Sequence, residues 1–362
     1  MSMDATKKEE RRVVLVTGGA GLIGSRVIHD LASSFQVIGL DIDPPSSDRA
    51  DVDWRQCDLT DDDNVSDTLQ AIRDRWGSQL ASVVHLAAYY DFSGEPSPLY
   101  EKLTVEGTRS LLRHLQSFDV EQFLFSSTLL VMKSSESGLP LSSQSPLEAE
   151  WDYPQSKLKT EEVIEHERGR IPALILRLAG AYDEQGHSPP ITQQISRIYE
   201  KQLESYFFPG DKDHGQSFIH LDDTVTAIRC AIERRAELPP LERLLIGEEE
   251  VLSYADLQDR IGELLHGQQW PAIRIPKMVA KAGAWVKDQW ASGDNAPFIK
   301  PWMIDLADQN YPINISRAES LLGWKPRHTL RETLPQMVEL LQRDPQKFYE
   351  INHLPVEHLH SR

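Results

Sequence analysis

The chain has 362 residues, of which 40% are hydrophobic, and this length suits one large α/β domain with an appended lobe or two modest domains. There are 56 acidic residues against 38 basic ones, and the formal net charge of −18 does not suit binding to nucleic acid or to an anionic membrane. Cys57 and Cys230 are far apart and belong to no Cys-x-x-Cys or Cys/His cluster, so the sequence indicates neither a disulfide framework nor a metal site.

The N-terminal stretch up to Arg12 is polar and lacks the apolar core of a signal peptide. No apolar run approaches the length that a membrane-spanning helix needs. We therefore expect a cytoplasmic protein without a membrane span, whose partner is a small-molecule substrate.

Residues 13–16 are a short β-branched apolar run that leads directly into clustered glycines, and residues 25–31 follow at helical spacing. This order predicts a strand, a tight turn and a helix, which together can bind a pyrophosphate. The backbone must approach the phosphates closely, and the helix N-terminus must point its free N–H groups at them, so side chains would block the contact. The predicted pyrophosphate-binding residues are Gly18, Gly21, Leu22, Ile23 and Gly24.

A second buried strand over 35–40 ends at Asp41, which lies 20 residues after Gly21. At this offset a carboxylate accepts hydrogen bonds from the ribose hydroxyls of NAD. The same negative charge would repel the 2′-phosphate of NADP. Asp41 therefore predicts NAD, rather than NADP, as the cofactor.

Strands and helices then alternate. We expect a strand over 52–59, a helix over 61–76 with an acidic first turn, and a buried strand over 80–88, in which the small Ala87 and Ala88 let the backbone pass close to a cofactor.

A helix over 100–118 and a fifth strand over 122–128 follow. The alternation predicts a parallel, doubly wound α/β sheet, a Rossmann-type fold. Ligands of such sheets bind outside the carboxyl ends of the strands, where the fifth strand places the hydroxyls of Ser126, Ser127 and Thr128.

Tyr153 and Lys157 are four residues apart in a predicted helix that runs to about residue 167, so they share one face. A free tyrosine titrates near 10 and is a poor base at neutral pH. A lysine one turn away and the positive ring of the cofactor would lower the pKa of Tyr153 by about 2–3 units, which suits a general acid/base. Thr128 would hold the substrate oxygen, and Lys157 would also bind the nicotinamide ribose.

The second half of the chain is expected to alternate between two lobes. Residues 12–180 form the dinucleotide-binding domain and 217–248 return to it, whereas 181–216 and 249–350 form a smaller, mostly helical substrate-binding lobe. Ser253 is a plausible helix cap. Residues 275–290 form an amphipathic helix that is either a lid or membrane-surface contact, or packs on its own lobe or on a partner chain.

With these residues the sequence resembles the extended short-chain dehydrogenases/reductases, a family that includes NAD-dependent epimerases, dehydratases and 3β-hydroxysteroid-type dehydrogenases. The resemblance spans nearly the whole chain in the family's order. Its motifs are Thr17-Gly18-Gly19-Ala20-Gly21-Leu22-Ile23-Gly24, Asp41, Asp58-Leu59, His85-Leu86-Ala87-Ala88, Ser126-Ser127-Thr128, Tyr153-Pro154-Gln155-Ser156-Lys157, Phe218-Ile219-His220-Leu221-Asp222-Asp223 and Leu321-Leu322-Gly323-Trp324-Lys325-Pro326.

The resemblance implies roles for these positions. Thr128, Tyr153 and Lys157 form the catalytic set, and Asp58 touches the adenine. The remaining implied cofactor-binding residues are Leu59, Leu86, Ala87 and Ala88. Families of this kind commonly form helix-packed dimers, so a homodimer is possible.

Several positions depart from the family pattern. Thr104 stands where the family has an asparagine that tethers a strand or holds a catalytic water. Sugar-nucleotide members bind the substrate diphosphate with an asparagine three residues after an arginine and with an arginine before the Phe-Ile-His motif. Here Gly180 follows Arg177 at that spacing and Gln216 precedes the motif, which disfavours a nucleotide sugar.

Two further features bear on the substrate. Sugar dehydratases place Asp-Glu after the catalytic threonine because elimination of water needs an extra acid and base, whereas this chain has Leu129 and Leu130. Tyr89 and Tyr90 follow the fourth strand, where they would form a floor for an apolar or ring-bearing substrate or simply pack.

The leading hypothesis is an NAD-dependent oxidoreductase that acts on a secondary alcohol or ketone of a small, non-nucleotide substrate. The first alternative is an NAD-dependent sugar or sugar-nucleotide epimerase, which oxidises and re-reduces one carbon without releasing NADH. The second is an NAD-binding regulator without catalysis, which has no physical reason to keep the set of Thr128, Tyr153 and Lys157.

Overall fold

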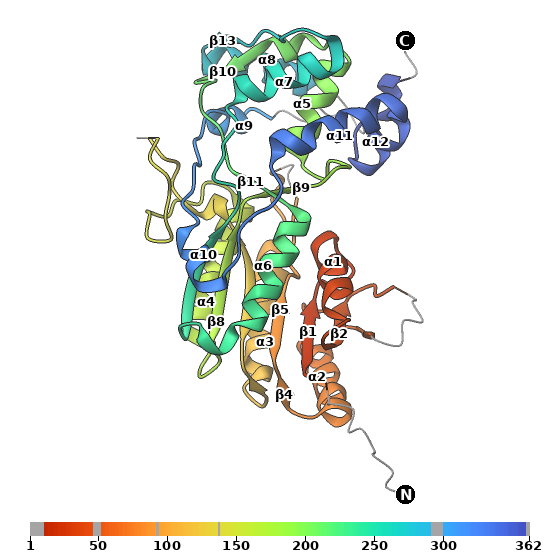
Figure 1. Ribbon diagram of the computed structural model, residues 1–362, viewed down its shortest axis with the longest axis vertical. Helices are drawn as coiled ribbons and strands as arrows, with labels where there is room; N and C mark the ends of the chain where they lie inside the picture. The colour runs from red at the N-terminus through yellow and green to blue at the C-terminus, as the bar shows by residue number, and fades with distance from the viewer. Residues whose placement is uncertain (1–10, 46–51, 92–93, 137, 291–299, 360–362) are drawn as a thin grey trace, which may run out of the picture.

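The computed structural model describes residues 11–45, 52–91, 94–136, 138–290 and 300–359, with the side chains of 286–290 and 357–358 excepted. Two lobes lie one above the other in Figure 1. The lower lobe contains the main sheet, and the upper lobe is mostly helical. Residues at the carboxyl ends of β7 and β8 and residues of the upper lobe line one cavity.

The lower lobe is built on a seven-stranded sheet in which every neighbouring pair is parallel, in the order β12-β8-β7-β5-β1-β2-β3. The bounds are β1 Val13–Thr17, β2 Gln36–Asp41, β3 Val52–Gln56, β5 Ser82–His85, β7 Phe123–Thr128, β8 Ala173–Leu178 and β12 Leu241–Ile246. The order reverses direction at β1, between β2 and β5. That switch point is where ligands bind in open parallel sheets.

Helices cover both faces of the sheet because side chains alternate along each strand. Val14 and Val16 of β1 pack with α1, α6 and α10, whereas Leu15 packs with α2, α3 and α4 on the other face. The bounds are α1 Leu22–Leu31, α2 Asp62–Trp76, α3 Gly107–Leu115, α4 Asp152–Glu167, α6 Leu221–Glu233 and α10 Ser316–Leu322. The predicted doubly wound α/β fold is confirmed.

The upper lobe buries a third core of its own, formed by α5, α7, α11 and α12. Its helices are α5 Pro189–Tyr199, α7 Tyr254–His266, α8 Lys277–Trp290, α9 Met303–Leu306, α11 Leu330–Arg343 and α12 Pro345–Ile351. The predicted cap of α7 is present, since the Ser253 hydroxyl accepts a hydrogen bond from the Asp256 N–H at 3.1 Å.

Short elements complete the fold. Three two-stranded parallel pairs join β4 Gln79–Leu80 to β6 Asp119–Val120, β9 Gly180–Tyr182 to β11 Phe218–His220, and β10 Phe207–Pro209 to β13 Ile273–Ile275. The 3₁₀ turns are η2 Leu129–Val131, η3 Leu203–Tyr206, η4 Arg235–Glu237 and η6 Val356–Leu359. The β9/β11 pair lies between the two lobes in Figure 1.

The structure refines some predicted elements. The helix expected over 100–118 consists of a π-helical stretch, η1 Tyr100–Glu106, followed by α3. The strand expected over 80–88 is already irregular after His85. Within 249–350, α10 and Trp324 pack into the core of the sheet, and Trp324 is 2% exposed. The division into domains at the predicted boundaries stays a proposal.

Candidate active site

A cavity of about 670 Å³ lies at the carboxyl ends of the strands and continues into the upper lobe. Its lower part is lined by the glycine turn, by Leu86 and Ala88 after β5, and by Thr128, Tyr153 and Lys157. Most of the remaining lining side chains are apolar, among them Leu129, Leu178, Phe208 and Trp302. A cavity of this size and character suits small ligands held largely by apolar contact.

The glycine turn is packed too tightly for side chains. Gly18 has a φ of +66°, and a Cβ there would lie 2.8 Å from the Ala87 nitrogen. A Cβ on Gly24 would overlap the carbonyl oxygen of Gly18. Gly21 is the N-cap of α1, so the free N–H groups of this helix open on the cavity beside Leu22 and Ile23. The structure thus brings the predicted pyrophosphate-binding residues together.

Asp41 ends β2 beside this turn. Its Oδ2 accepts a hydrogen bond from the Ala20 N–H at 2.9 Å, and its Oδ1 accepts one from the Asp43 N–H at 3.3 Å. The carboxylate is therefore held against the backbone of the turn while its side chain stays partly exposed. Its role toward the NAD ribose stays a proposal.

Three other predicted cofactor residues, Asp58, Leu59 and Ala87, lie outside the cavity lining. Asp58 accepts hydrogen bonds from the N–H and hydroxyl of Thr60, both at 2.8 Å, and so closes the turn before α2. Leu59 is buried, and its carbonyl would be 3.0 Å from a Cβ on Gly107. The predicted contact of Asp58 with adenine stays a proposal.

The predicted catalytic residues meet at the ends of β7 and α4. Thr128 ends β7 and lines the cavity together with Tyr153, which lies in the first turn of α4. Lys157 lies one turn further along, where its Nζ donates to the Ser126 carbonyl at 2.8 Å and lies 4.8 Å from the centroid of the Phe125 ring. The predicted constellation is thus present in space, with the lysine tied to the strand that carries the threonine.

Burial shifts the titration of both ionisable groups. It raises the pKa of Tyr153 above the usual range, and the neighbouring Thr128 side chain opposes this only in part. Burial also lowers the pKa of Lys157 to about 7, although the nearby Glu161 carboxylate acts in the opposite direction. In the protein alone, Tyr153 is a neutral phenol, contrary to the predicted direction of its pKa shift. That prediction counted the positive ring of NAD and stays a prediction for the complex.

Glu161 lies one turn after Lys157 on α4 and was not predicted from the sequence. It is 2% exposed and accepts hydrogen bonds from the Ser127 hydroxyl at 2.6 Å and from Arg177 Nε and Nη2 at 3.0 and 2.7 Å. Arg243 Nε lies 3.5 Å from the same carboxylate. The four-residue spacing from Lys157 to Glu161 in a helix was the available signal.

Thr104 replaces the family's asparagine and still tethers the segment after β5. Its hydroxyl accepts a hydrogen bond from the Tyr89 N–H at 3.0 Å. The ring of Tyr89 packs edge-on against Tyr100, with centroids 4.8 Å apart, and is not part of the cavity lining. Tyr90 does line the cavity, edge-on to Tyr153 with centroids 5.0 Å apart. Of the two predicted substrate tyrosines, the structure brings Tyr90 to the site.

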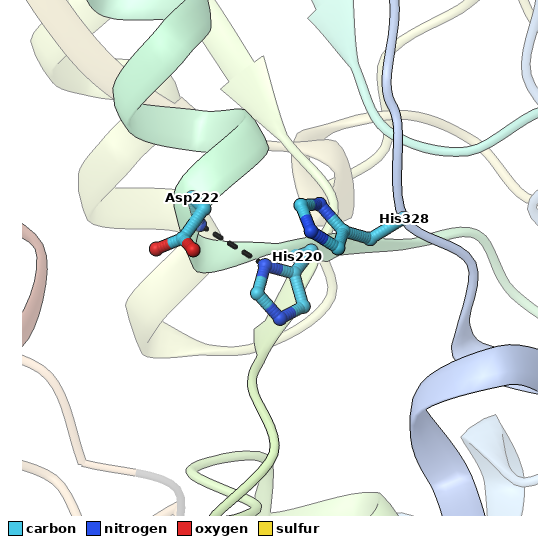
Figure 2. A group of neighbouring side chains, drawn as sticks. All are labelled: His220, Asp222 and His328. Atoms are coloured by element: carbon cyan, nitrogen blue, oxygen red, sulfur yellow. Dashed lines mark hydrogen bonds between the residues drawn. The ribbon is translucent and has the colours of Figure 1, made fainter.

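A second group of titratable side chains lies where α6 begins. Ligand atoms of His220, Asp222 and His328 lie within 4.8 Å of one another (Figure 2). However, His220 Nδ1 accepts a hydrogen bond from the Asp222 N–H, and its buried Nε2, 3.3 Å from a Glu184 oxygen, makes no hydrogen bond within the described residues. His328 Nδ1 bonds to Asp223 at 3.0 Å. Because His220 Nδ1 already caps α6 and His328 Nδ1 is bonded to Asp223, we interpret this group as a helix cap and a contact between segments.

Comparison with known proteins shows the family of this chain. Residues 14–247 match the model of the NAD dependent epimerase/dehydratase family. The chain belongs to this family. The predicted resemblance is confirmed, and so are the predictions of an enzyme and of NAD as the family's cofactor.

Individual relatives are more distant. A putative UDP-glucose 4-epimerase of Methanocaldococcus jannaschii is 24% identical over 92% of this chain and 99% of its own. A decarboxylating sterol-4-alpha-carboxylate 3-dehydrogenase of Candida albicans is 21% identical over 93% of this chain and 99% of its own. The structure of UDP-glucuronic acid 4-epimerase from Bacillus cereus, in complex with UDP-glucuronic acid and NAD, has a TM-score of 0.66 at 21% identity, covering 91% of this chain and 99% of that one. This last likeness supports the fold.

Among the helices of the described ranges, none combines the length and the apolar character that crossing a membrane requires. The cytoplasmic location and the homodimer stay predictions.

Proposed function

We propose that the protein is an NAD-dependent oxidoreductase that interconverts a secondary alcohol and a ketone on a small, non-nucleotide substrate with an apolar, ring-bearing body. One observation carries the proposal: Thr128, Tyr153 and Lys157 line one largely apolar cavity that begins at the glycine turn. The lower lobe, 12–180 with 217–248, would bind the cofactor. The upper lobe, 181–216 with 249–350, would enclose the substrate.

Different residues of the chain would bind different parts of NAD. Gly18, Gly21 and the N–H groups of α1 would hold the pyrophosphate, and Asp41 would accept the ribose hydroxyls. Lys157 would hydrogen-bond the nicotinamide ribose while its contact with the Ser126 carbonyl fixes its position. When bound, NAD supplies a ring that takes or returns a hydride.

Proton transfer would fall to Tyr153. In ketone reduction its neutral phenol donates a proton to the carbonyl oxygen, and Thr128 holds that oxygen in place. In alcohol oxidation the phenol must first lose its proton, which the raised pKa opposes in the protein alone. The positive charges of Lys157 and of the nicotinamide ring would then lower the pKa.

The lining argues for the substrate class. Gly180 and Gln216 line the cavity at the two places where sugar-nucleotide enzymes place phosphate-binding groups, and neither side chain carries a positive charge. Leu129 and Leu130 line it directly after Thr128, where elimination of water would need an acid and a base. Both features favour a dehydrogenase or reductase over an enzyme of nucleotide sugars.

The test is Tyr153→Phe, which keeps the ring and removes the hydroxyl group that would transfer the proton. We expect turnover with a panel of alcohols and ketones, followed by NADH absorbance, to fall by roughly 10²–10⁴-fold, the usual contribution of a general acid/base. The affinity for NAD, measured by calorimetry, should change little. Tyr199→Phe is the matched control, since Tyr199 is outside the cavity lining. Undiminished turnover of Tyr153→Phe would remove the phenol from the mechanism.

The second candidate is an epimerase, which the likeness to the UDP-glucose 4-epimerase of M. jannaschii favours. An epimerase retains NAD through purification and converts UDP-glucose to its 4-epimer without net formation of NADH. Chromatography of the sugar nucleotide together with NADH absorbance separates the two functions. The dehydrogenase forms NADH with a simple alcohol, and the epimerase does not.

A further inference from the structure

The cavity does not end at Tyr153. It continues into the upper lobe, where α5, β10 and α7 line it with Arg197, Phe208 and Tyr254. These three elements lie together in the upper lobe in Figure 1, away from the sheet. A substrate that fills the cavity from Tyr153 upward therefore has its far end beside these residues.

Arg197 is a cation in a mainly apolar surrounding. Its side chain is half-buried on α5, and within the described ranges its guanidinium has neither an ion pair nor a side-chain hydrogen bond. Glu204 places a carboxylate in the lining of the same cavity. Arg177 shows the contrast, because it is fully buried and paired twice to Glu161. Partial burial of an unpaired guanidinium costs free energy that a bound anion would recover.

Tyr254 places a second donor beside it. The ring of Tyr254 stacks on Phe208 with centroids 3.8 Å apart and an interplanar angle of 25°, so the phenol is held in one orientation. Arg197 on α5 and Tyr254 at the start of α7 line the same cavity, and these two helices pack against each other. Burial raises the pKa of Tyr254, and the charge of Arg197 opposes this. Within the described residues no hydrogen bond reaches the Tyr254 hydroxyl. A neutral phenol and a guanidinium are both donors, and together they match a carboxylate or a similar oxyanion.

We propose that Arg197 and Tyr254 form an anion subsite, and that the substrate is an amphipathic anion. It would carry its secondary alcohol near Tyr153, an apolar ring-bearing body along the cavity, and a carboxylate, sulfate or phosphate ester in the upper lobe. The substrate class rests on the proposed function, whereas the subsite itself does not.

The subsite is tested with a matched pair of fluorescent probes and the full chain saturated with NAD, which keeps the probes out of the cofactor site. The anionic probe is 8-anilinonaphthalene-1-sulfonate, and the neutral one is N-phenyl-1-naphthylamine, which lacks only the sulfonate. Arg197→Gln should weaken the sulfonate at least about tenfold and leave the neutral probe unchanged, because a charge-assisted contact is lost. Arg197→Lys keeps a cation without the planar fork and should weaken the sulfonate about threefold.

Arg260→Gln is the control. Arg260 lies on α7, exposed and paired with Glu263, so its loss should alter neither affinity. A tenfold loss confined to the sulfonate and to position 197 supports the subsite. A smaller loss of sulfonate affinity in Arg197→Gln, or an equal loss of affinity for both probes, overturns the subsite.

A competition experiment, in which unlabelled ligands displace the anionic probe, identifies the class of ligand. UDP should fail to displace the sulfonate from the wild-type protein, whereas a hydroxylated steroid acid should displace it and its methyl ester should do so at least about tenfold less well. Displacement by UDP that disappears in Arg197→Gln would assign the subsite to a nucleotide and overturn the amphipathic substrate. Probe binding does not depend on turnover, so loss of activity in Tyr153→Phe and loss of sulfonate binding in Arg197→Gln report on separate claims.

Discussion

At the end of β2, the carboxylate of Asp41 is held in one orientation by the backbone. Its two oxygens accept N–H groups from Ala20 and Asp43, which orient the side chain beside the glycine turn. We expect Asp41→Ala to weaken NAD about tenfold, because hydrogen bonds to a charged group are worth about 1.5–3 kcal/mol, and to leave NADP binding unchanged or improved. Calorimetry with both coenzymes measures the change. The exposed Asp43→Ala is the control, and an unchanged ratio of the two affinities in Asp41→Ala would refute the assignment.

Lys157 gives the protein a pH-dependent stability. Its pKa of about 7 in the folded chain lies below the value near 10.4 of an unfolded lysine, so the unfolded state binds more protons between these values. This contribution therefore rises with pH above 7, by about 1 kcal/mol per pH unit. Urea unfolding at pH 7 and pH 9 should show wild type gaining stability relative to Lys157→Met.

Lys159→Met is the comparison for this prediction. Lys159 is on the same helix but exposed, with its Nζ 3.2 Å from Glu101. The difference between wild type and Lys159→Met should not change with pH. An equal pH dependence for both variants would show that burial of Lys157 does not set its titration.

At the scale of elements, Glu161 joins α4 to β7, β8 and β12 through Ser127, Arg177 and Arg243. Glu161→Gln removes the charge and leaves the buried Arg177 without its partner, which costs about 3–5 kcal/mol in comparable pairs. The free energy of unfolding in urea should fall by that order. Glu162→Gln, the exposed neighbour, should change it by less than about 0.5 kcal/mol. A loss of similar size at both positions would contradict the network.

The amphipathic helix expected over 275–290 is α8, and its apolar residues are exposed. Met278 is 83% exposed and Trp285 is 59% exposed, so within the described side chains this face does not pack on its own lobe. The alternatives of a lid, a membrane-surface contact or a partner chain stay predictions.

The elements that the sequence predicts well are those with local signals. The apolar run, the glycines and the helical spacing of 13–31 lie next to one another, and Tyr153 and Lys157 share a face whatever packs on α4. Glu161 and Arg197 were missed because their meaning depends on long-range neighbours. An arginine on α5 looks like any helical surface residue until the fold turns it toward a cavity.

At the scale of the molecule, the two lobes are joined by several buried contacts. Glu248, just after β12, accepts hydrogen bonds from the Tyr182 hydroxyl at 2.6 Å and from the Leu330 N–H at 2.9 Å. Arg26 of α1 bridges Asp183 at 2.5 Å and Asp222 at 3.2 Å. These contacts tie α1 to segments that lead into the upper lobe.

We therefore expect calorimetry to show one cooperative unfolding transition for the whole chain. NAD at about 100 times its dissociation constant should add about 2.7 kcal/mol of stability and raise the Tm by a few degrees. NADP at the same concentration should raise it less. Two separate transitions, with only one moved by NAD, would contradict this coupling.

Trp324 lies in the core of the sheet although it comes near the end of the chain, and its Nε1 donates to the Asp223 carbonyl at 3.0 Å. During synthesis, β1 and α1 emerge before this indole, and the apolar core face to which all three belong is completed only when the indole has left the ribosome. Nascent chains that stall before it would expose that apolar face, and such surfaces favour aggregation or capture by chaperones. The order of translation therefore makes completion of the lower lobe one of the last events in the folding of this protein.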